Sequence, residues 1–389
     1  MGEDLSWFQY EKKDAATSGG LICRTLQTLC KKAVLGYGRS LNCFWKASKT
    51  GASEDSWNPW RLNRSCSSRR SVETRNSHLQ RSGSSMKQNP KKVFGRVTSW
   101  SQYLENGSGK DDGVNISKDH TTDLSELFLG QKFASGTHSR LYHAFYKQQA
   151  VAVKLIMPPT EDEALAIRLD QQFSQEVALL SRLRHPNIVQ FVSACKNPPV
   201  FCVIMEYLPG GSLKNFLHKS EPYSLSIELV ISIALDTASG MEYLHSEGII
   251  HRDLKSDNLV MTEDLRVKVA DFGVSCLETH KEDMKGYTGT YRWMAPEMIK
   301  GKLCSRKVDV FSFGIVLWEL LTGLTPYSDM TPVQAAFAVC QKNARPAIPP
   351  HCPRVMAKLM KKCWSTNPSN RPEFSEVVKV LEDFRMKSK

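Results

Sequence analysis

The order of two hydrophobic patterns constrains the fold of this chain more than any other feature. Short runs rich in β-branched and aromatic residues come first, between residues 127 and 206, and one helical stretch at 169–183 interrupts them. The segment LPGGS (208–212) follows, and beyond it the pattern is mainly helical. Strands and helices that are segregated along a chain predict an α+β protein. We therefore expect two lobes joined by a short Gly-Pro-rich hinge.

Two stretches of the second half have clear helical signals. SIELVISIALDTASGMEYLHSEG (226–248) repeats apolar residues at helical spacing and ends on Gly248, which is a typical residue after a helix. VDVFSFGIVLWELLTG (308–323) is apolar nearly all round. A helix of that kind is expected to be buried on most of its sides.

The N-terminal region differs in composition from the rest. Residues 1–120 carry 20 Lys and Arg against 11 Asp and Glu, so +9 of the net charge of +12 lies there. Within them, residues 61–92 hold nine basic residues, eight serines and one acid. We predict that 1–120 is a basic, Ser-rich and largely disordered region. Because the rest of the chain is nearly neutral, we expect no binding to nucleic acid.

The tail leaves several readings open. The spacing of apolar residues in 21–34 fits a short amphipathic helix or a transient helix in a mobile tail. Ser67 and Ser84 stand in R-x-x-S patterns. A weak contact with an anionic membrane, a scaffold role and an inert linker are the alternatives.

Cysteines and hydropathy indicate the compartment. The eleven cysteines form no Cys-x-x-Cys pair, and their number is odd, so we expect reduced thiols without a zinc site. No apolar run approaches membrane-spanning length, and the start MGEDLSWFQYEKKD is too polar for a secretory signal. We therefore expect a cytoplasmic protein, with the plasma membrane as a peripheral site and no transmembrane segment.

The most specific motif is HRDLKSDNLV (251–260), followed by VADFG (269–273). Together with VAVK (151–154) upstream and APE (295–297) downstream, this pattern resembles the eukaryotic protein kinase domain. The resemblance covers about 121–389. It implies a bilobal fold with a small, mainly antiparallel β lobe at about 127–204, a hinge at about 205–210 and a larger helical lobe at about 211–389.

A kinase site must hold the charges of ATP and its metal. The resemblance assigns Asn258 and Asp271 to Mg²⁺, with Mn²⁺ as a substitute, and Lys154 to the α- and β-phosphates. A helix carboxylate must orient that lysine, and Glu176 is the best candidate. The alternative, Glu163, lies close to Lys154 in sequence and before the expected helix.

The same resemblance assigns the catalytic loop. Asp253 matches the residue that accepts the proton of the substrate hydroxyl, and Lys255 the residue that steadies the transferring phosphoryl group. His251 is expected to pack in the core. Two further assignments are structural: Asp309 holds catalytic-loop amides, and Arg371 pairs with Glu297.

The adenine site follows from family position. Met205 matches the gatekeeper, and Glu206 and Leu208 present backbone groups to adenine. The apolar walls are assigned to Val260 below and to Phe133, Leu141 and Ala152 above.

The phosphate-binding loop departs from the family. Of its three usual glycines only Gly136 is present, and Ala134 and Ser139 take the other two places. Both replacements are small and neither removes a backbone N–H, so we expect an active enzyme with a modified lid. The alternative is a pseudokinase that serves as a scaffold or binding module.

The hydroxyl specificity is read from Lys255 and from GTYRWMAPE (289–297). Both favour a serine/threonine kinase, with dual specificity left open. With FASGTHSRLY (133–142), they resemble the tyrosine-kinase-like branch, and within it the plant Raf-like MAP kinase kinase kinases of group C. That resemblance implies a protein substrate, with a MAP kinase kinase as the expected one.

Control by phosphorylation is a further expectation. Arg252 precedes the catalytic Asp, and such an arginine can pair with a phosphate on the activation loop. Thr288 is the first candidate for that phosphate and Ser275 the second, with Thr279 and Tyr287 also present. Thr290 is expected to bond toward Asp253 instead.

Overall fold

The computed structural model describes residues 98–99, 124–198, 200–219, 225–279 and 290–388. The predicted tail at 1–120, with its helix at 21–34, Ser67 and Ser84, lies outside the described residues except for 98–99. Tyr287 and Thr288 also lie outside them. No helix within these ranges is both long and apolar enough to cross a membrane.

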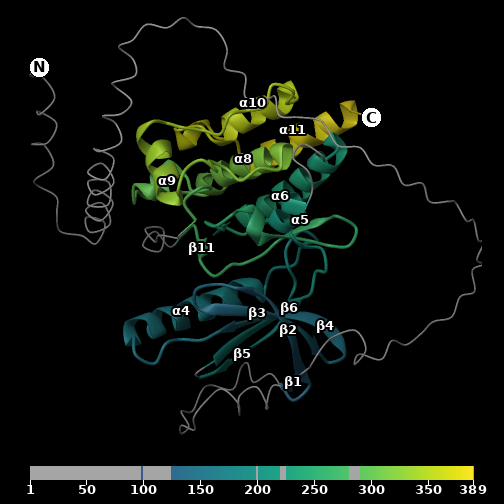
Figure 1. Ribbon diagram of the computed structural model, residues 1–389, viewed down its shortest axis with the longest axis vertical. Coiled ribbons are helices and arrows are strands. Elements are labelled where there is room, and N and C mark those ends of the chain that lie inside the picture. Colours follow the sequence, from purple (N-terminus) through teal and green to yellow (C-terminus); the bar gives the residue numbers. More distant parts are fainter. Residues whose placement is uncertain (1–97, 100–123, 199, 220–224, 280–289, 389) are drawn as a thin grey trace, which may run out of the picture. The chain divides into compact units, whose positions relative to one another are not determined.

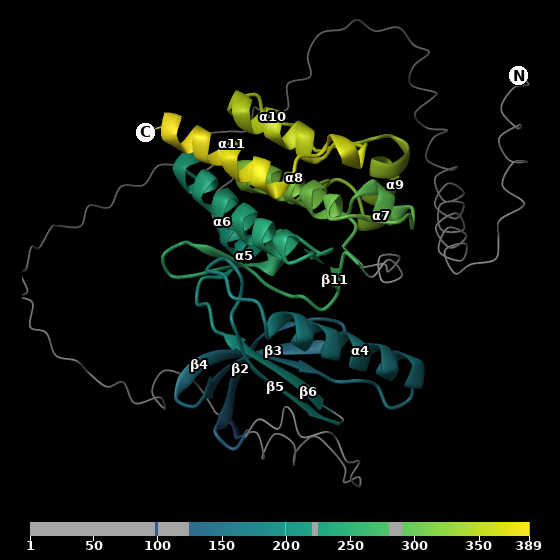
Figure 2. The same cartoon turned by 180° about the vertical axis from the view of Figure 1, so that it is seen from behind.

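The first lobe is a six-stranded antiparallel sheet with one helix against it (Figures 1 and 2). Its strand order is β1-β2-β3-β4-β6-β5. The strands are β1 (Thr98–Ser99), β2 (Leu127–Ser135), β3 (Ser139–Tyr146), β4 (Gln149–Ile156), β5 (Phe191–Asn197) and β6 (Val200–Glu206). Because β1 pairs with Phe128 and Leu129, the sheet includes residues upstream of the boundary expected at 121.

Both faces of this sheet are covered by apolar side chains. On one face Leu127, Val153, Leu155 and Ile204 form a separate small core. The other face packs against α4 (Glu163–Leu180), where the Phe173 and Phe201 rings lie 5.1 Å apart. Burial on both faces explains why β4 and β6 read as nearly continuous apolar runs in the sequence.

The helix of this lobe begins earlier than the sequence pattern indicated. α4 starts at Glu163 instead of residue 169, so the expectation that Glu163 precedes the helix is wrong. The Asp162 side chain accepts a hydrogen bond from the Leu165 amide at 2.9 Å and so caps the first turn of α4. This first turn lies mostly at the surface, so it lacks the apolar periodicity from which the helix was predicted.

The second lobe is mainly helical. Its helices are α5 (Leu213–Lys219), α6 (Ile227–Ser246), α7 (Pro296–Ile299), α8 (Lys307–Thr322), α9 (Pro332–Gln341), α10 (Arg354–Cys363) and α11 (Phe374–Lys387). Its short strands are β7 (Gly211–Ser212), β8 (Ile249–Ile250), β9 (Leu259–Met261), β10 (Val267–Val269) and β11 (Cys276–Leu277). The predicted α+β fold with an antiparallel β lobe and a helical lobe is confirmed.

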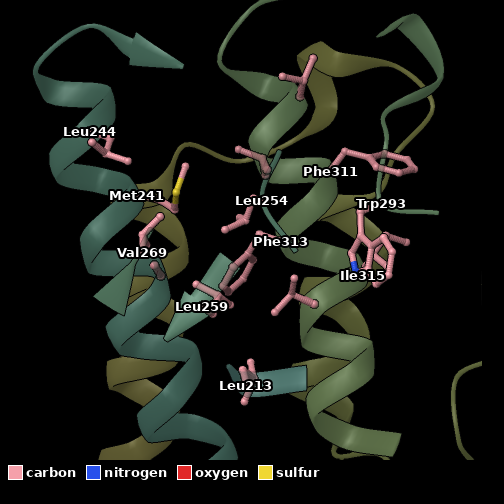
Figure 3. Packing of buried hydrophobic residues seen from close by; sticks show 14 of the residues in the cluster. Leu213, Met241, Leu244, Leu254, Leu259, Val269, Trp293, Phe311, Phe313 and Ile315 are labelled. Atoms are coloured by element: carbon pink, nitrogen blue, oxygen red, sulfur yellow. The ribbon is translucent and has the colours of Figure 1, made fainter. Parts of the chain in front are cut away.

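The core of the helical lobe lies between α6 and α8 (Figure 3). Met241 and Leu244 of α6 face Phe313 of α8, with Leu254 and Leu259 between them. Nearly every residue of α8 is buried, as its all-round apolar sequence predicted. The loops that carry HRD and DFG run over this core and are therefore held on a rigid base.

A buried ion pair joins α7 to the segment before α11. Arg371 is fully buried and donates two hydrogen bonds to the Glu297 carboxylate, at 2.6 and 2.9 Å. Its guanidinium also lies 5.1 Å from the centre of the Phe311 ring. The predicted pairing of Arg371 with Glu297 is confirmed.

We expect Arg371→Met to lower the free energy of unfolding by about 3–5 kcal/mol, because it leaves the Glu297 carboxylate without its cation. The loss of unfolding free energy in the double variant Arg371→Met/Glu297→Gln should be clearly smaller than the sum of the losses in the two single variants. Urea unfolding of the four proteins measures the coupling. Additive losses would mean that the two side chains stabilise the fold independently.

Candidate active site

A cavity of about 780 Å³ is lined by residues of the β sheet, the hinge and the catalytic loop. Most residues that the sequence assigned to the site line it: Phe133, Ala134, Gly136, Leu141, Ala152, Lys154, Glu176, Met205, Glu206, Leu208, Lys255, Asn258, Val260 and Asp271. Asp253 is not among its lining residues. It is joined to the cavity by hydrogen bonds from Lys255 and Asn258.

Lys154 lies at the centre of the charged part of the cavity. Its ammonium group donates to both Glu176 oxygens, at 2.8 and 3.0 Å, and to Asp271 Oδ1 at 2.8 Å. Lys154 comes from β4, Glu176 from α4 and Asp271 from the DFG loop. These contacts fix the positions of the strand, the helix and the loop relative to one another.

The three charges shift one another's protonation. Lys154 holds the pKa of Asp271 down to about 2, so this carboxyl stays ionised. Burial alone would lower the pKa of Lys154, but the two neighbouring carboxylates raise it above its usual value. Burial raises the pKa of Glu176 more than Lys154 lowers it. Asp271, the more exposed of the two carboxylates, is therefore the one more suited to bind a cation.

The catalytic loop is held from below by Asp309. This fully buried carboxylate accepts from the His251 amide at 2.9 Å and from the Arg252 amide at 2.8 Å. Its Oδ2 also lies 2.9 Å from His245 Nε2. The predicted role of Asp309 is confirmed, and His251 packs in the core as expected, edge-on to Phe272.

Asp253 is oriented by two neighbours on its own loop. Lys255 Nζ donates to Asp253 Oδ2 at 2.6 Å, and Asn258 Nδ2 donates to the same oxygen at 3.0 Å. Lys255 also donates to Thr290 Oγ1 at 2.9 Å. The expectation that Thr290 bonds toward Asp253 is thus corrected, because Lys255 lies between them and bonds to both.

Two residues on the cavity wall fit a divalent cation. Asn258 uses its amide N–H₂ on Asp253, so its side-chain oxygen is the atom that can coordinate. Asp271 engages Lys154 through Oδ1, and its side chain is 47% exposed toward the cavity. An amide oxygen and a carboxylate are ligands suited to Mg²⁺, which usually shares its coordination with substrate phosphates and water.

The hinge is tied to the lower lobe through Glu206. Its amide donates to the Gln190 carbonyl at 3.0 Å, and its carboxylate accepts from Lys268 Nζ at 2.7 Å. The Leu208 amide, in contrast, makes no hydrogen bond within the described part of the chain. Leu208 therefore has a donor available to the cavity, whereas only the carbonyl of Glu206 remains for this role.

The loop between β2 and β3 is closed by a tight turn. The Gly136 amide donates to the Ser139 carbonyl at 2.8 Å, and a Cβ at Gly136 would lie 2.8 Å from Ser139 Oγ. Any larger residue at 136 would therefore have to displace the Ser139 side chain. Phe133 covers the cavity edge, and its ring lies 6.2 Å from the Tyr207 ring of the hinge.

The regulatory candidates fall in different surroundings. Ser275 is buried, and its hydroxyl donates to the His251 carbonyl at 3.2 Å. Arg252 is nearly buried on a backbone with φ of 69°, one residue before Asp253. Thr288 lies outside the described residues, so phosphate control of the loop stays a prediction.

The sequence reasoning missed a buried acid beneath the site. Glu319 of α8 accepts from Trp293 Nε1 at 2.6 Å and from Ser256 Oγ at 2.8 Å. Burial raises its pKa to about 8, even though both hydrogen bonds lower it. An acid among the apolar residues of the C-terminal half of α8 was the sequence signal that could have revealed it.

Comparison with known proteins identifies the family of this chain. Residues 127–381 match the family described as protein tyrosine and serine/threonine kinase. The chain belongs to this family. The kinase is 55% identical over 338 residues to the serine/threonine/tyrosine-protein kinase HT1 of Arabidopsis thaliana, a match that covers 84% of this chain and 87% of HT1.

More distant relatives share mainly the kinase domain. Over 290 residues this kinase is 44% identical to the serine/threonine-protein kinase STY46 of Arabidopsis thaliana, which covers 73% of the chain and 50% of STY46. It is 37% identical over 264 residues to the dual specificity protein kinase pyk3 of Dictyostelium discoideum, covering 68% of the chain and 19% of pyk3.

We expect Glu319 to make the stability of this kinase depend on pH. Its pKa in the folded state lies above the ordinary 4.5, so its contribution is complete below about pH 4.5 and is lost as pH rises through about 8. Glu319→Gln should therefore gain stability relative to the wild type between about pH 5.5 and about pH 8.5. Urea unfolding at both pH values measures this, with the exposed Glu382→Gln as control. Parallel pH profiles of wild type and Glu319→Gln would contradict the assignment.

Proposed function

We propose that this kinase transfers the γ-phosphoryl group of ATP to serine and threonine hydroxyls of proteins. The observation that carries the proposal is the joining of Lys154 to both Glu176 and Asp271. A buried cation between two carboxylates is poised to meet phosphate charges.

Different residues of the cavity would bind the phosphates, the adenine and the metal ion during phosphoryl transfer. Lys154, held by Glu176, would bind the α- and β-phosphates, while the Leu208 amide and the apolar walls of the cavity hold adenine. Asn258 and Asp271 would hold Mg²⁺, which neutralises phosphate charge when bound.

Asp253 would receive the proton of the attacking hydroxyl. Its Oδ2 is occupied by Lys255 and Asn258, and no described group donates to Oδ1. Oδ1 is therefore the atom that would accept the substrate O–H. Lys255 lies within hydrogen-bond distance of Asp253 and Thr290 and would balance the charge that develops on the transferred phosphoryl group.

The substrate class is a second part of the proposal. Lys255 with Thr290 favours serine and threonine hydroxyls. The names of HT1, a serine/threonine/tyrosine-protein kinase, and of pyk3, a dual specificity protein kinase, support dual specificity as the alternative. The likeness of 289–297 to Raf-like kinases supports a MAP kinase kinase as the protein substrate.

The basic region at 1–120 supports a proposal about location. Its charge of +9 would attract an anionic membrane surface, at up to about 1 kcal/mol per basic residue near the surface. We place the kinase in the cytoplasm, with peripheral contact to the plasma membrane through this region. Thr288 is favoured over Ser275 as the regulatory site, because the Ser275 hydroxyl is buried and engaged.

Removal of the Asp253 carboxylate would distinguish an enzyme from a pseudokinase. Asp253→Asn should lower kcat by roughly 10²–10⁴, the range of a lost general base. Asp264→Asn, an exposed acid in the β9–β10 turn, serves as the matched control and should retain wild-type turnover. The measurement is the rate of phosphate transfer from Mg-ATP to protein substrates, with phosphosite mapping to identify the modified hydroxyls. Equal rates for wild type and Asp253→Asn would favour the pseudokinase.

Another prediction concerns the missing glycines. Ala134→Gly/Ser139→Gly should change kcat/KM for ATP by less than about tenfold, or about 1.4 kcal/mol, since the Gly136 turn already forms. Gly136→Ala should raise KM for ATP, because its Cβ meets Ser139 Oγ. A gain of about a hundredfold in the double variant would instead identify the loop as an inhibitory element.

A further inference from the structure

A groove on the helical lobe, separate from the ATP cavity, is lined almost entirely by one face of α10. Its volume is about 540 Å³, and it is lined by Arg354, Ala357, Lys358, Lys361, Lys362, Ser365 and Asn370. The first five lie on α10 at positions i, i+3, i+4, i+7 and i+8, which is one face of an α-helix. Four of the seven lining residues are cations. We call this feature the α10 groove.

The surrounding chain contains no acid to neutralise these charges. From Met330 to Pro372 the sequence has seven Lys and Arg and not one Asp or Glu. Arg371 of this stretch is paired with Glu297, whereas the four groove cations form no ion pair with any carboxylate of the described residues. All four side chains are exposed. The groove therefore presents a dense positive field in a domain that is close to neutral overall.

Helix stability does not account for this arrangement. Lys361 and Lys362 at the C-terminal end suit the helix dipole, but Arg354 occupies the first position of α10, where a cation is unfavourable. Arg354 and Lys358 are four residues apart, and Lys358 and Lys361 three apart, so they repel each other along the helix. Repulsion among these cations lowers the stability of the free protein. Binding of an anion to the cluster would relieve that repulsion.

We propose that the α10 groove binds an acidic polypeptide segment of a protein partner. No large exposed apolar side chain lines the groove to enter lipid, so the groove suits an acidic chain better than a membrane surface. Arg354 and Lys361 are about 10 Å apart along the helix axis, the distance that about three residues of an extended chain span. The segment would thus carry acids about three residues apart, and the polar side chains of Ser365 and Asn370 would meet its backbone.

The test compares two double variants of the full chain with equal changes of charge. Lys358→Glu/Lys361→Glu alters the groove, and Lys379→Glu/Arg385→Glu alters exposed cations of α11 outside it. The probe is a fluorescein-labelled decapeptide with Glu at every third position and Gly at the others, measured by fluorescence anisotropy. We expect binding about tenfold weaker for the groove variant than for the α11 variant, with weaker binding of the wild type at high salt.

Each other outcome overturns the proposal. Equal affinities of the two variants would show that attraction is unspecific, including attraction to the basic N-terminal region. The groove variant could instead bind the peptide as the wild type does but no longer sediment with vesicles of phosphatidylcholine and about 30% phosphatidylserine. That result would assign the groove to membranes. Circular dichroism melting checks folding, and if the Glu variants unfold, Lys358→Gln/Lys361→Gln against Lys379→Gln/Arg385→Gln decides in the same way.

Discussion

The buried carboxylate of Asp309 is the interaction on which the site depends. A buried charge is costly unless donors surround it, and Asp309 has two loop amides and the His245 ring. Through those two amides the rigid helix α8 holds the backbone at His251 and Arg252, including the left-handed conformation of Arg252. Asp253 follows directly, so its position is set by a helix that itself lies in the core.

The nucleotide side of the cavity has a different organisation. No single element holds it; instead Lys154, Glu176 and Asp271 hold one another across a strand, a helix and a loop. Such a cluster assembles only when all three elements are in place, since each partner left alone would be a poorly compensated charge. The Lys154 cluster therefore links the orientation of α4 to the conformation of the DFG loop, and both to the phosphate binding that we propose for Lys154.

Charge is distributed unevenly over the helical lobe. Three of its acids, Glu297, Asp309 and Glu319, each accept hydrogen bonds from buried donors. Cations without acidic partners gather on the outer face of α10. The interior charges bind backbone and side-chain donors that fix loops, whereas the outer cations form no ion pair within the described chain. This contrast distinguishes charges that maintain the fold from charges available to a partner.

The sequence by itself determined the α+β fold and the buried α8, because apolar periodicity is a local property of the chain. The loop amides held by Asp309 and the pairing of Arg371 with Glu297 followed from the resemblance to protein kinases. The sequence did not determine the start of α4, since the capped first turn is mostly exposed and lacks apolar periodicity. Only the tertiary structure placed Lys255 between Asp253 and Thr290, buried Ser275, and set Glu319 against Trp293. Except for the bond between Lys255 and Asp253, those contacts join residues distant along the chain. Their directions depend on how loops lie on the core, which no residue pattern encodes.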